Sequence, residues 1–114
     1  MMSKFFDYEK KLQFAKAERR HAAYVTDVLK MEVKHHKQYG FTIPIDADTE
    51  IEKAQNAILD FDQILQDKPK RLKERFERKA MIVGYIDIFD ELCAKMSDCI
   101  DEMHESFDRQ YRAQ

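Results

Sequence analysis

The chain contains only two segments at which it is expected to turn. Two glycines and two prolines occur among its 114 residues, far below ordinary usage. β-Sheets and long loops need frequent turn residues, so this scarcity favours an all-α fold. The interruptions are residues 40–48 and the Lys68 and Pro69 pair. They predict one domain of three helices in an up-down-up arrangement, over about residues 3–39, 47–67 and 69–112.

Local signals set the expected helix ends. Gly40 is suited to end the first helix in the left-handed conformation. Asp46 or Asp48 can cap the second helix, and Pro69 fits the first position of the third. Gly84 interrupts the third helix, at a cost of about 1 kcal/mol relative to alanine. We expect it to mark a close contact with a neighbouring helix rather than a kink.

The third predicted helix carries an unusually regular row of apolar side chains. They recur every three or four residues for more than three heptads, which is typical of left-handed helix packing. A second row widens the apolar arc in the first half of this helix. The first row is Ile82, Ile86, Phe89, Cys93, Met96, Ile100, Met103 and Phe107, and the second is Met81, Tyr85, Ile88 and Leu92.

The helix lengths predict an oligomer. At 1.5 Å per residue the helices span roughly 54, 29 and 65 Å, whereas a compact domain of this size has a radius of gyration of about 13 Å. With tight turns, the second helix covers only residues 20–39. The third helix would start beside Arg19 and pass the turn at Gly40 near Asp90.

In that arrangement, the end of the third helix and the start of the first project in opposite directions. Both segments are amphipathic, so we expect their apolar faces to be buried in an oligomer, most simply a homodimer. The alternative is a break at Gly84 that gives a compact four-helix monomer. The predicted interface residues are Phe5, Tyr8, Leu12, Met96, Ile100, Met103, Phe107 and Tyr111.

Charge is distributed unevenly along the third helix. Its start is strongly basic. Residues 87–108 are instead rich in Asp and Glu, and Lys95 is the only Lys or Arg among them. Antiparallel pairing of two third helices would place basic starts against acidic ends. The basic start is also a candidate for binding a nucleic-acid backbone, although Phe76 is its one aromatic side chain for stacking. Its cations are Lys68, Lys70, Arg71, Lys73, Arg75, Arg78 and Lys79.

Three carboxylate and histidine pairs share the spacing used by ferritin-like di-iron bundles. Residues three apart on a helix project together, so each pair could hold one metal ion. The two pairs of the first helix lie roughly 21 Å apart along its axis, too far to share a site within one chain. We therefore treat a metal site, built across an oligomer interface, as an alternative. The pairs are Glu18 with His21, Glu32 with His35, and Asp101 with His104.

Other features favour a non-enzymatic cytoplasmic protein. No Gly-rich phosphate loop occurs, and an offset of six residues turns Cys93 away from Cys99, so free thiols in a reducing compartment are expected. The N-terminus lacks an apolar signal segment, and the longest apolar run, residues 80–86, is too short to span a bilayer. We predict a homo-oligomeric protein–protein interaction module, such as an adaptor, assembly chaperone or inhibitor. The alternatives are a ferritin-like metal-binding protein and a nucleic-acid-binding dimer.

Overall fold

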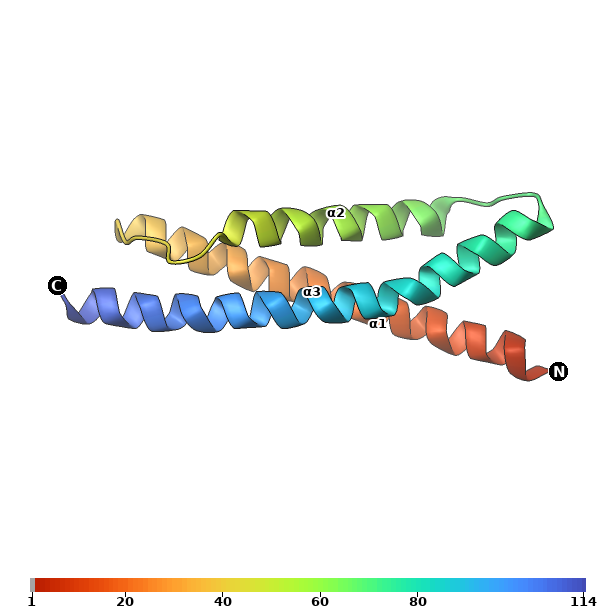
Figure 1. Ribbon diagram of the computed structural model, residues 1–114, viewed down its shortest axis with the longest axis horizontal. Helices are drawn as coiled ribbons and strands as arrows, with labels where there is room; N and C mark the ends of the chain where they lie inside the picture. The colour runs from red at the N-terminus through yellow and green to blue at the C-terminus, as the bar shows by residue number, and fades with distance from the viewer. Residues whose placement is uncertain (1) are drawn as a thin grey trace.

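Three helices make up the fold, as the sequence predicts. The computed structural model describes the chain from Met2 to Gln114, with side chains from Asp7 onward. Helix α1 spans Met2–Gln38, α2 spans Ala47–Gln66 and α3 spans Leu72–Arg112. They run up, down and up, and the two ends of the chain lie at opposite ends of a rod (Figure 1) that measures 64 × 23 × 14 Å. Within the described residues, no helix is both long and apolar enough to cross a membrane.

The turn between α1 and α2 follows the local sequence signals. Gly40 has a φ of 67°, in the left-handed region, and its N–H donates to the carbonyl of Lys37 at 3.1 Å. Asp46 caps α2: one carboxylate oxygen accepts from the Thr49 N–H at 3.2 Å, and the other accepts from the Thr49 hydroxyl at 2.6 Å. Both predictions for this turn are confirmed, with Asp46 as the cap.

The connection between α2 and α3 differs from the expected tight turn. Asp67 and Arg71 have extended backbone conformations, with ψ of 134° and 139°, and α3 begins at Leu72. The predicted start at Pro69 is therefore wrong. A proline disfavours helix in the residue before it, and the Pro69 carbonyl accepts a hydrogen bond from Nε of Arg75 at 3.1 Å.

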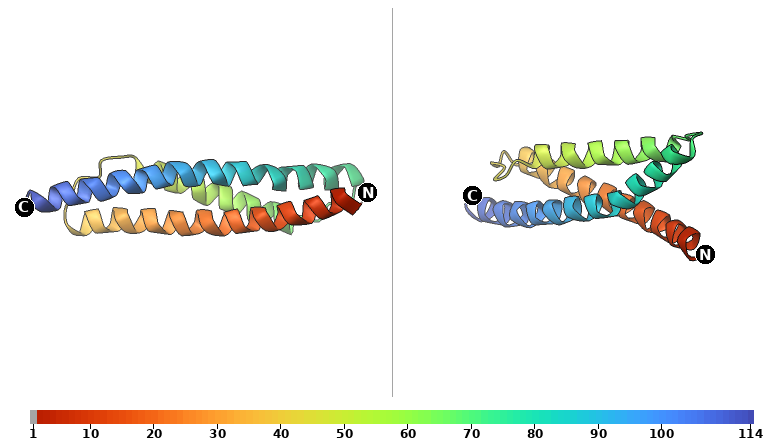
Figure 2. Two further views of the ribbon diagram at one scale, coloured as in Figure 1. Left: turned by 90° about the horizontal axis from the view of Figure 1, so that it is seen from below. Right: turned by 45° about the vertical axis from the view of Figure 1, so that its right-hand side comes forward.

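The extended connection moves α3 along the rod, which makes the predicted register wrong. The five residues between the two helices can reach about 16 Å when extended, and α3 starts well beyond the end of α2 (Figure 1). Nζ of Lys79 lies 4.8 Å from the ring centroid of Tyr8, near the start of α1. At the other end, the Gln110 amide accepts from the N–H of Thr42 and donates to its carbonyl, each at 2.8 Å. Helix α3 thus runs alongside the length of α1 (Figure 2) instead of projecting past it.

The regular apolar row of α3 faces the core. Ile82, Phe89, Cys93, Met96 and Met103 are buried. They pack with the buried faces of α1 and α2 in one continuous cluster. The cluster includes Ala15, Ala22, Val25, Leu29 and Val33 of α1, and Ala47, Ile51, Ala54 and Phe61 of α2.

Aromatic rings fill the centre of the bundle. Phe61 of α2 is fully buried and lies 5.2 Å from Phe89 and 5.4 Å from Tyr85, measured between ring centroids. The two α3 rings are 5.5 Å apart. Such aromatic pairs contribute about 0.5–1.5 kcal/mol each beyond the burial of their area. They fix α2 against the middle of α3.

Gly84 neither breaks α3 nor contacts another helix. The helix is continuous from Leu72 to Arg112, and a Cβ built at Gly84 would meet no atom within 4 Å. The predicted close contact is wrong, and the four-helix alternative that requires a break here does not form. The glycine is exposed to solvent on the outside of the bundle.

Candidate interaction surfaces

Four residues of the predicted oligomer interface are wholly or partly covered by the chain's own helices. Met96 and Met103 are fully buried, because the long connection aligns them with α1 instead of letting them project. Leu12 and Ile100 are partly buried against the same core. A fully covered side chain offers no surface to a partner, so the predicted interface role is wrong for Met96 and Met103, while for the other members it stays a prediction. Phe5 lies outside the residues whose side chains are described.

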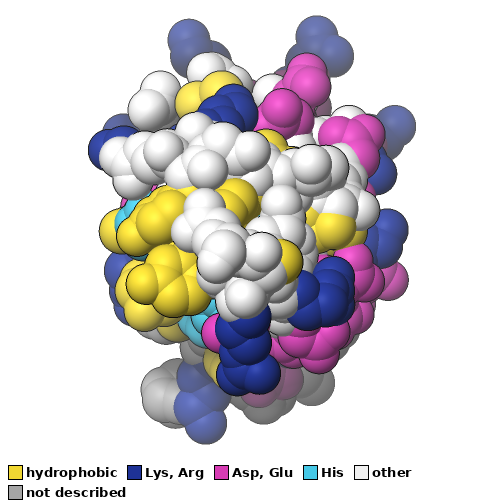
Figure 3. Space-filling view, turned by 90° about the vertical axis from the view of Figure 1, so that its left-hand side faces the viewer, with side chains coloured by type: hydrophobic (Ala, Val, Ile, Leu, Met, Phe, Trp, Pro, Cys, Tyr) yellow, Lys and Arg dark blue, Asp and Glu magenta, His cyan; other side chains and the backbone are white. Residues whose placement is uncertain are grey.

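The three remaining members of that predicted interface lie near the ends of the rod. Tyr8 lies beneath Lys79, at the end where α3 begins. Phe107 and Tyr111 stack at the opposite end, with ring centroids 6.1 Å apart, and Tyr39 lies 5.1 Å from Phe107. Hydrophobic side chains are visible on this end of the molecule in Figure 3. Tyr111 is the only described member of the predicted interface that is mainly exposed, at 55%.

His36 is a buried residue of this aromatic end that the sequence did not reveal. Its side chain is fully buried, 5.6 Å from the Phe107 ring and 6.3 Å from the Phe41 ring. Nδ1 lies 2.9 Å from the carbonyl oxygen of Glu32, which can only accept, so Nδ1 is the donor there. Nε2 has no hydrogen-bond partner within the described part of the chain. The burial of His36 could not be read from the sequence, because this residue stands among lysines and a second histidine.

Among the candidate metal ligands, only Glu32 and His104 form a contact. Nε2 of His104 is 2.7 Å from a carboxylate oxygen of Glu32, which ties α3 to α1. His21, His35 and Asp101 are exposed, and Glu18 lies near Cys93 instead. In the described part of the chain, no group of three or more His, Cys, Asp or Glu side chains is placed to hold a metal ion.

A hollow of about 460 Å³ lies beside the Glu32 and His104 pair. It is formed by side chains of α1 and α3 and is rich in carboxylates. A hollow lined by anions favours cationic side chains of a partner. Its lining residues are Glu32, His35, His104, Glu105, Phe107 and Asp108.

Part of the basic cluster at the start of α3 has a structural role. Nε of Arg78 donates to the carbonyl of Ile64, and Nη2 donates to the carbonyl of Leu65, both at 2.9 Å. These carbonyls belong to the last turn of α2, where helix geometry leaves no backbone partner. A cation is also favoured by the negative end of the helix dipole. Arg78 therefore caps the end of α2, while Arg75 braces the connection through Pro69.

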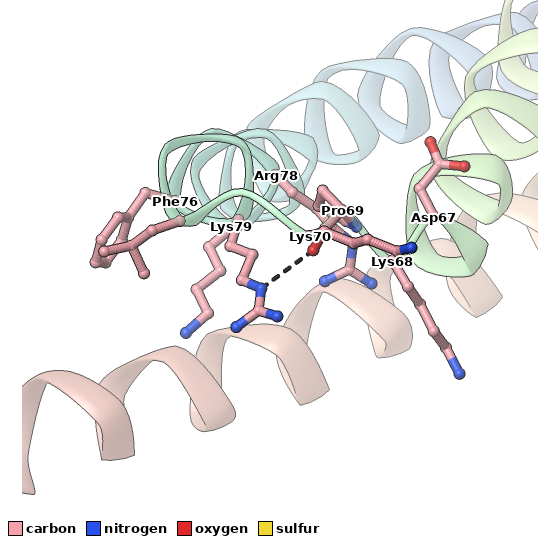
Figure 4. Close-up of a pocket in the computed structure, with 9 residues that line it drawn as sticks. Asp67, Lys68, Pro69, Lys70, Phe76, Arg78 and Lys79 are labelled. Carbon is pink, nitrogen blue, oxygen red and sulfur yellow. Dashed lines mark hydrogen bonds between the residues drawn. The ribbon is translucent and has the colours of Figure 1, made fainter.

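Five cations of this cluster border an open hollow of about 460 Å³ (Figure 4), namely Lys68, Lys70, Arg75, Arg78 and Lys79. Leu72 and Phe76 line it and are 66% and 62% exposed. Lys68 and Lys70 stand beside them and form no ion pair with the described residues. This end of the rod thus combines positive charge with exposed apolar surface. Lys73 makes only a long contact with Glu77, at 3.9 Å.

A row of side chains on the outer side of α1 exposes three large apolar residues to solvent. Phe14, Tyr24 and Met31 are 55%, 67% and 56% exposed. Together with residues between them they recur in alternating steps of three and four, the spacing of a helix-pairing seam. We call this row the outer stripe. Its members are Phe14, Ala17, His21, Tyr24, Val28, Met31 and His35, all exposed except for half-buried Val28.

Two opposite charges flank the outer stripe. Arg20 and Asp27 are exposed, and neither forms a hydrogen bond or ion pair with the described part of the chain. Each lies directly before a stripe residue, His21 or Val28. In a two-helix seam this is the position from which charges reach the partner helix.

The two cysteines are free, as predicted. Burial raises the pKa of Cys93, and the nearby carboxylates of Glu18 and Asp90 raise it further. Burial also raises the pKa of Cys99. Because the thiolate is the reactive form, these environments hold both residues in the unreactive thiol form.

Comparison with known proteins gives no further guide to these surfaces. No protein-family model matches the sequence, and no curated protein or solved structure matches it either. Function must therefore be inferred from the exposed residues themselves.

Proposed function

We propose that the protein is a non-enzymatic helical protein–protein interaction module that works as a homo-oligomer. The observation that carries this proposal is the outer stripe, with Phe14, Tyr24 and Met31 each more than half exposed. Covering a large apolar side chain contributes about 1.5–3 kcal/mol. A contiguous exposed row of this kind marks an interaction surface more often than scattered single residues do.

The shape of the molecule supports this role. Its shortest dimension is 14 Å, so the helices enclose a narrow core and each keeps a long face toward solvent. The outer stripe extends roughly 32 Å along α1. That is long enough for a second helix to pack over several turns. An adaptor, an assembly chaperone or an inhibitor would use such a face.

Sedimentation velocity over a range of concentrations tests the proposal. The wild type is expected to form a larger species as concentration rises. Tyr24→Glu is expected to prevent this, because it places a charge in the middle of the seam. Leu59→Glu is the matched control, since Leu59 is 65% exposed on α2, away from the stripe. A wild type that stays monomeric throughout would reject the proposal.

A second candidate function is binding of a nucleic-acid backbone at the start of α3. It is favoured by Lys68, Lys70 and Arg71, which the fold does not use in ion pairs within its described part, and by exposed Phe76 beside them. Single-stranded RNA and duplex DNA are the probes. Binding should weaken steeply with salt, and reversal of all three charges should abolish it. No binding at low salt would exclude this function.

A further inference from the structure

We propose that the partner of the outer stripe is a second copy of this chain, with the two α1 helices antiparallel about a two-fold axis. In this arrangement Arg20 of each subunit faces Asp27 of the partner subunit. The inference rests on the proposed function and adds to it the direction and register of the partner helix. It follows from the order of side chains along the stripe and beside it.

The stripe fixes which residues meet. In a seam of this type, the first and fourth positions of each heptad pack together, and in an antiparallel pair first positions meet fourth positions. Phe14, His21 and Val28 hold first positions, whereas Ala17, Tyr24 and Met31 hold fourth positions. One register then pairs each large side chain with a suitable partner. Phe14 meets the partner subunit's Met31, His21 meets the partner subunit's Tyr24, and Val28 meets the partner subunit's Ala17.

The flanking charges select that register. Arg20 and Asp27 both precede first positions, and in an antiparallel pair such residues face one another across the seam. The register above therefore gives two Arg20 contacts with the partner subunit's Asp27. A shift of one heptad in one direction brings Arg20 beside the partner subunit's Arg20. A shift in the other direction brings Asp27 beside the partner subunit's Asp27.

The flanking charges also select the antiparallel direction. In a parallel pair, a residue before a first position faces the residue five places further along the partner helix. Asp27 would then face the partner subunit's Glu32 at two symmetric places, and like charges there oppose association. Arg20 would face the partner subunit's Val25. The antiparallel pairing replaces two repulsive contacts with two attractive ones.

The opposite edge of the seam supplies an independent contact. The same register brings Lys11 to the level of the partner subunit's Glu32. That carboxylate lines the hollow of about 460 Å³ that also contains Glu105 and Asp108. Lys11 is exposed and forms no ion pair with the described residues of its own chain. Because the dimer is two-fold symmetric, each of its two anionic hollows receives Lys11 of the partner subunit.

Charge reversal provides the test, measured by sedimentation equilibrium of the full chain. Arg20→Glu alone and Asp27→Arg alone each create two like-charge contacts, and each should raise the dimer Kd at least about tenfold. The double variant recreates both contacts with the signs exchanged. Its Kd should return to within about threefold of the wild type. Far-ultraviolet circular dichroism confirms that all three variants keep their helix content.

A distance measurement tests the direction. Spin labels attached through a ketone-bearing unnatural residue at position 37 leave Cys93 and Cys99 native. In the proposed dimer the two labels are separated by roughly 43 Å along the α1 axis. In a parallel pair they lie at the same level, on helices whose axes are about 10 Å apart. A short distance would overturn the inference.

The two proposals fail in different ways. If the wild type dimerises, Tyr24→Glu dissociates it and the double charge variant does not recover, then the register is wrong while the stripe remains the interaction surface. If single reversals leave the Kd unchanged, the register is likewise wrong. A wild type that never self-associates rejects both the dimer and the proposed homo-oligomeric function.

Discussion

Arg19 and Asp62 join α1 to α2 through two parallel hydrogen bonds. Nε of Arg19 donates to one carboxylate oxygen at 3.0 Å, and Nη2 donates to the other at 2.7 Å. The two side chains are 32% and 34% exposed, so solvent screens the pair in part. The contact joins residues 43 positions apart in the sequence and thereby ties α1 to α2.

This ion pair is expected to stabilise the fold modestly. A double-mutant cycle with Arg19→Ala and Asp62→Ala should give a coupling energy of about 0.5–1 kcal/mol in urea unfolding. The bidentate geometry favours the upper end of that range. Lys73 and Glu77 provide the control pair, because they are 3.9 Å apart and 88% and 59% exposed. Equal coupling energies for the two pairs would contradict the expectation.

Arg78 should contribute to stability through the end of α2. Arg78→Ala removes two hydrogen bonds and leaves the carbonyls of Ile64 and Leu65 without this partner. We expect a loss of about 1–2 kcal/mol in the free energy of unfolding. Lys70→Ala removes an exposed cation of the same cluster and should change it by less than about 0.5 kcal/mol. Similar losses for both variants would show that the cluster does not cap α2.

The two glycines should respond to alanine in opposite directions. Gly84→Ala should raise the free energy of unfolding by about 0.5–1 kcal/mol, because the site is helical and its Cβ position is open. Gly40→Ala should lower it, because φ is 67° and an alanine is strained there. Thermal or urea unfolding measures both. Destabilisation by Gly84→Ala would point to a need for flexibility in α3.

The cap of α2 should make stability depend on pH on the acid side. Hydrogen bonds from the Thr49 hydroxyl and N–H lower the pKa of Asp46. The folded-state pKa is therefore below the unfolded value of about 3.9. The stabilisation is present above the unfolded value and is lost as pH falls through the folded one.

Asp46→Asn separates this effect from general acid unfolding. Asparagine keeps a side-chain oxygen as a cap but does not titrate. The stability advantage of the wild type over Asp46→Asn should be largest near neutral pH and shrink below about pH 4. Asp48→Asn is the control, because no hydrogen bond is formed by the Asp48 side chain within the described residues. An advantage that stays constant with pH would contradict the expected role of Asp46.

Much of the fold could be predicted because it depends on local signals. Gly40 and Asp46 act within a few residues of themselves, so the turn between α1 and α2 was readable. The row from Ile82 to Met103 also faces the core as its spacing indicates. The connection before Leu72 could not be read in the same way. A proline permits either a helix start or an extended segment, and the choice here involves Arg75 and Arg78, six or more residues away.

The residues of the outer stripe can be read in the sequence, but the sequence does not show that this side of α1, and not another, is exposed. Helix α1 carries apolar residues on more than one side, and the side that contacts α3 depends on the register of the two helices. That register depends on the length of the connection between α2 and α3, which is longer than the tight turn expected from the sequence. His21 and His35 also interrupt the stripe and make it less apolar than the buried row. The exposure of Phe14 and Tyr24 therefore depends on how the three helices pack, and it could not be predicted from the sequence alone.

The parallel course of α1 and α3 has a consequence for how the chain folds. Thr26 contacts Met96, and Glu32 contacts His104, across 70 and 72 positions of sequence. Pairs this far apart require closure of a large loop before any of their contact energy is gained. Folding should accordingly be slower than in helical bundles whose neighbours are joined by short loops. We expect α1 and α2 to dock first and the contacts between α1 and α3 to form last.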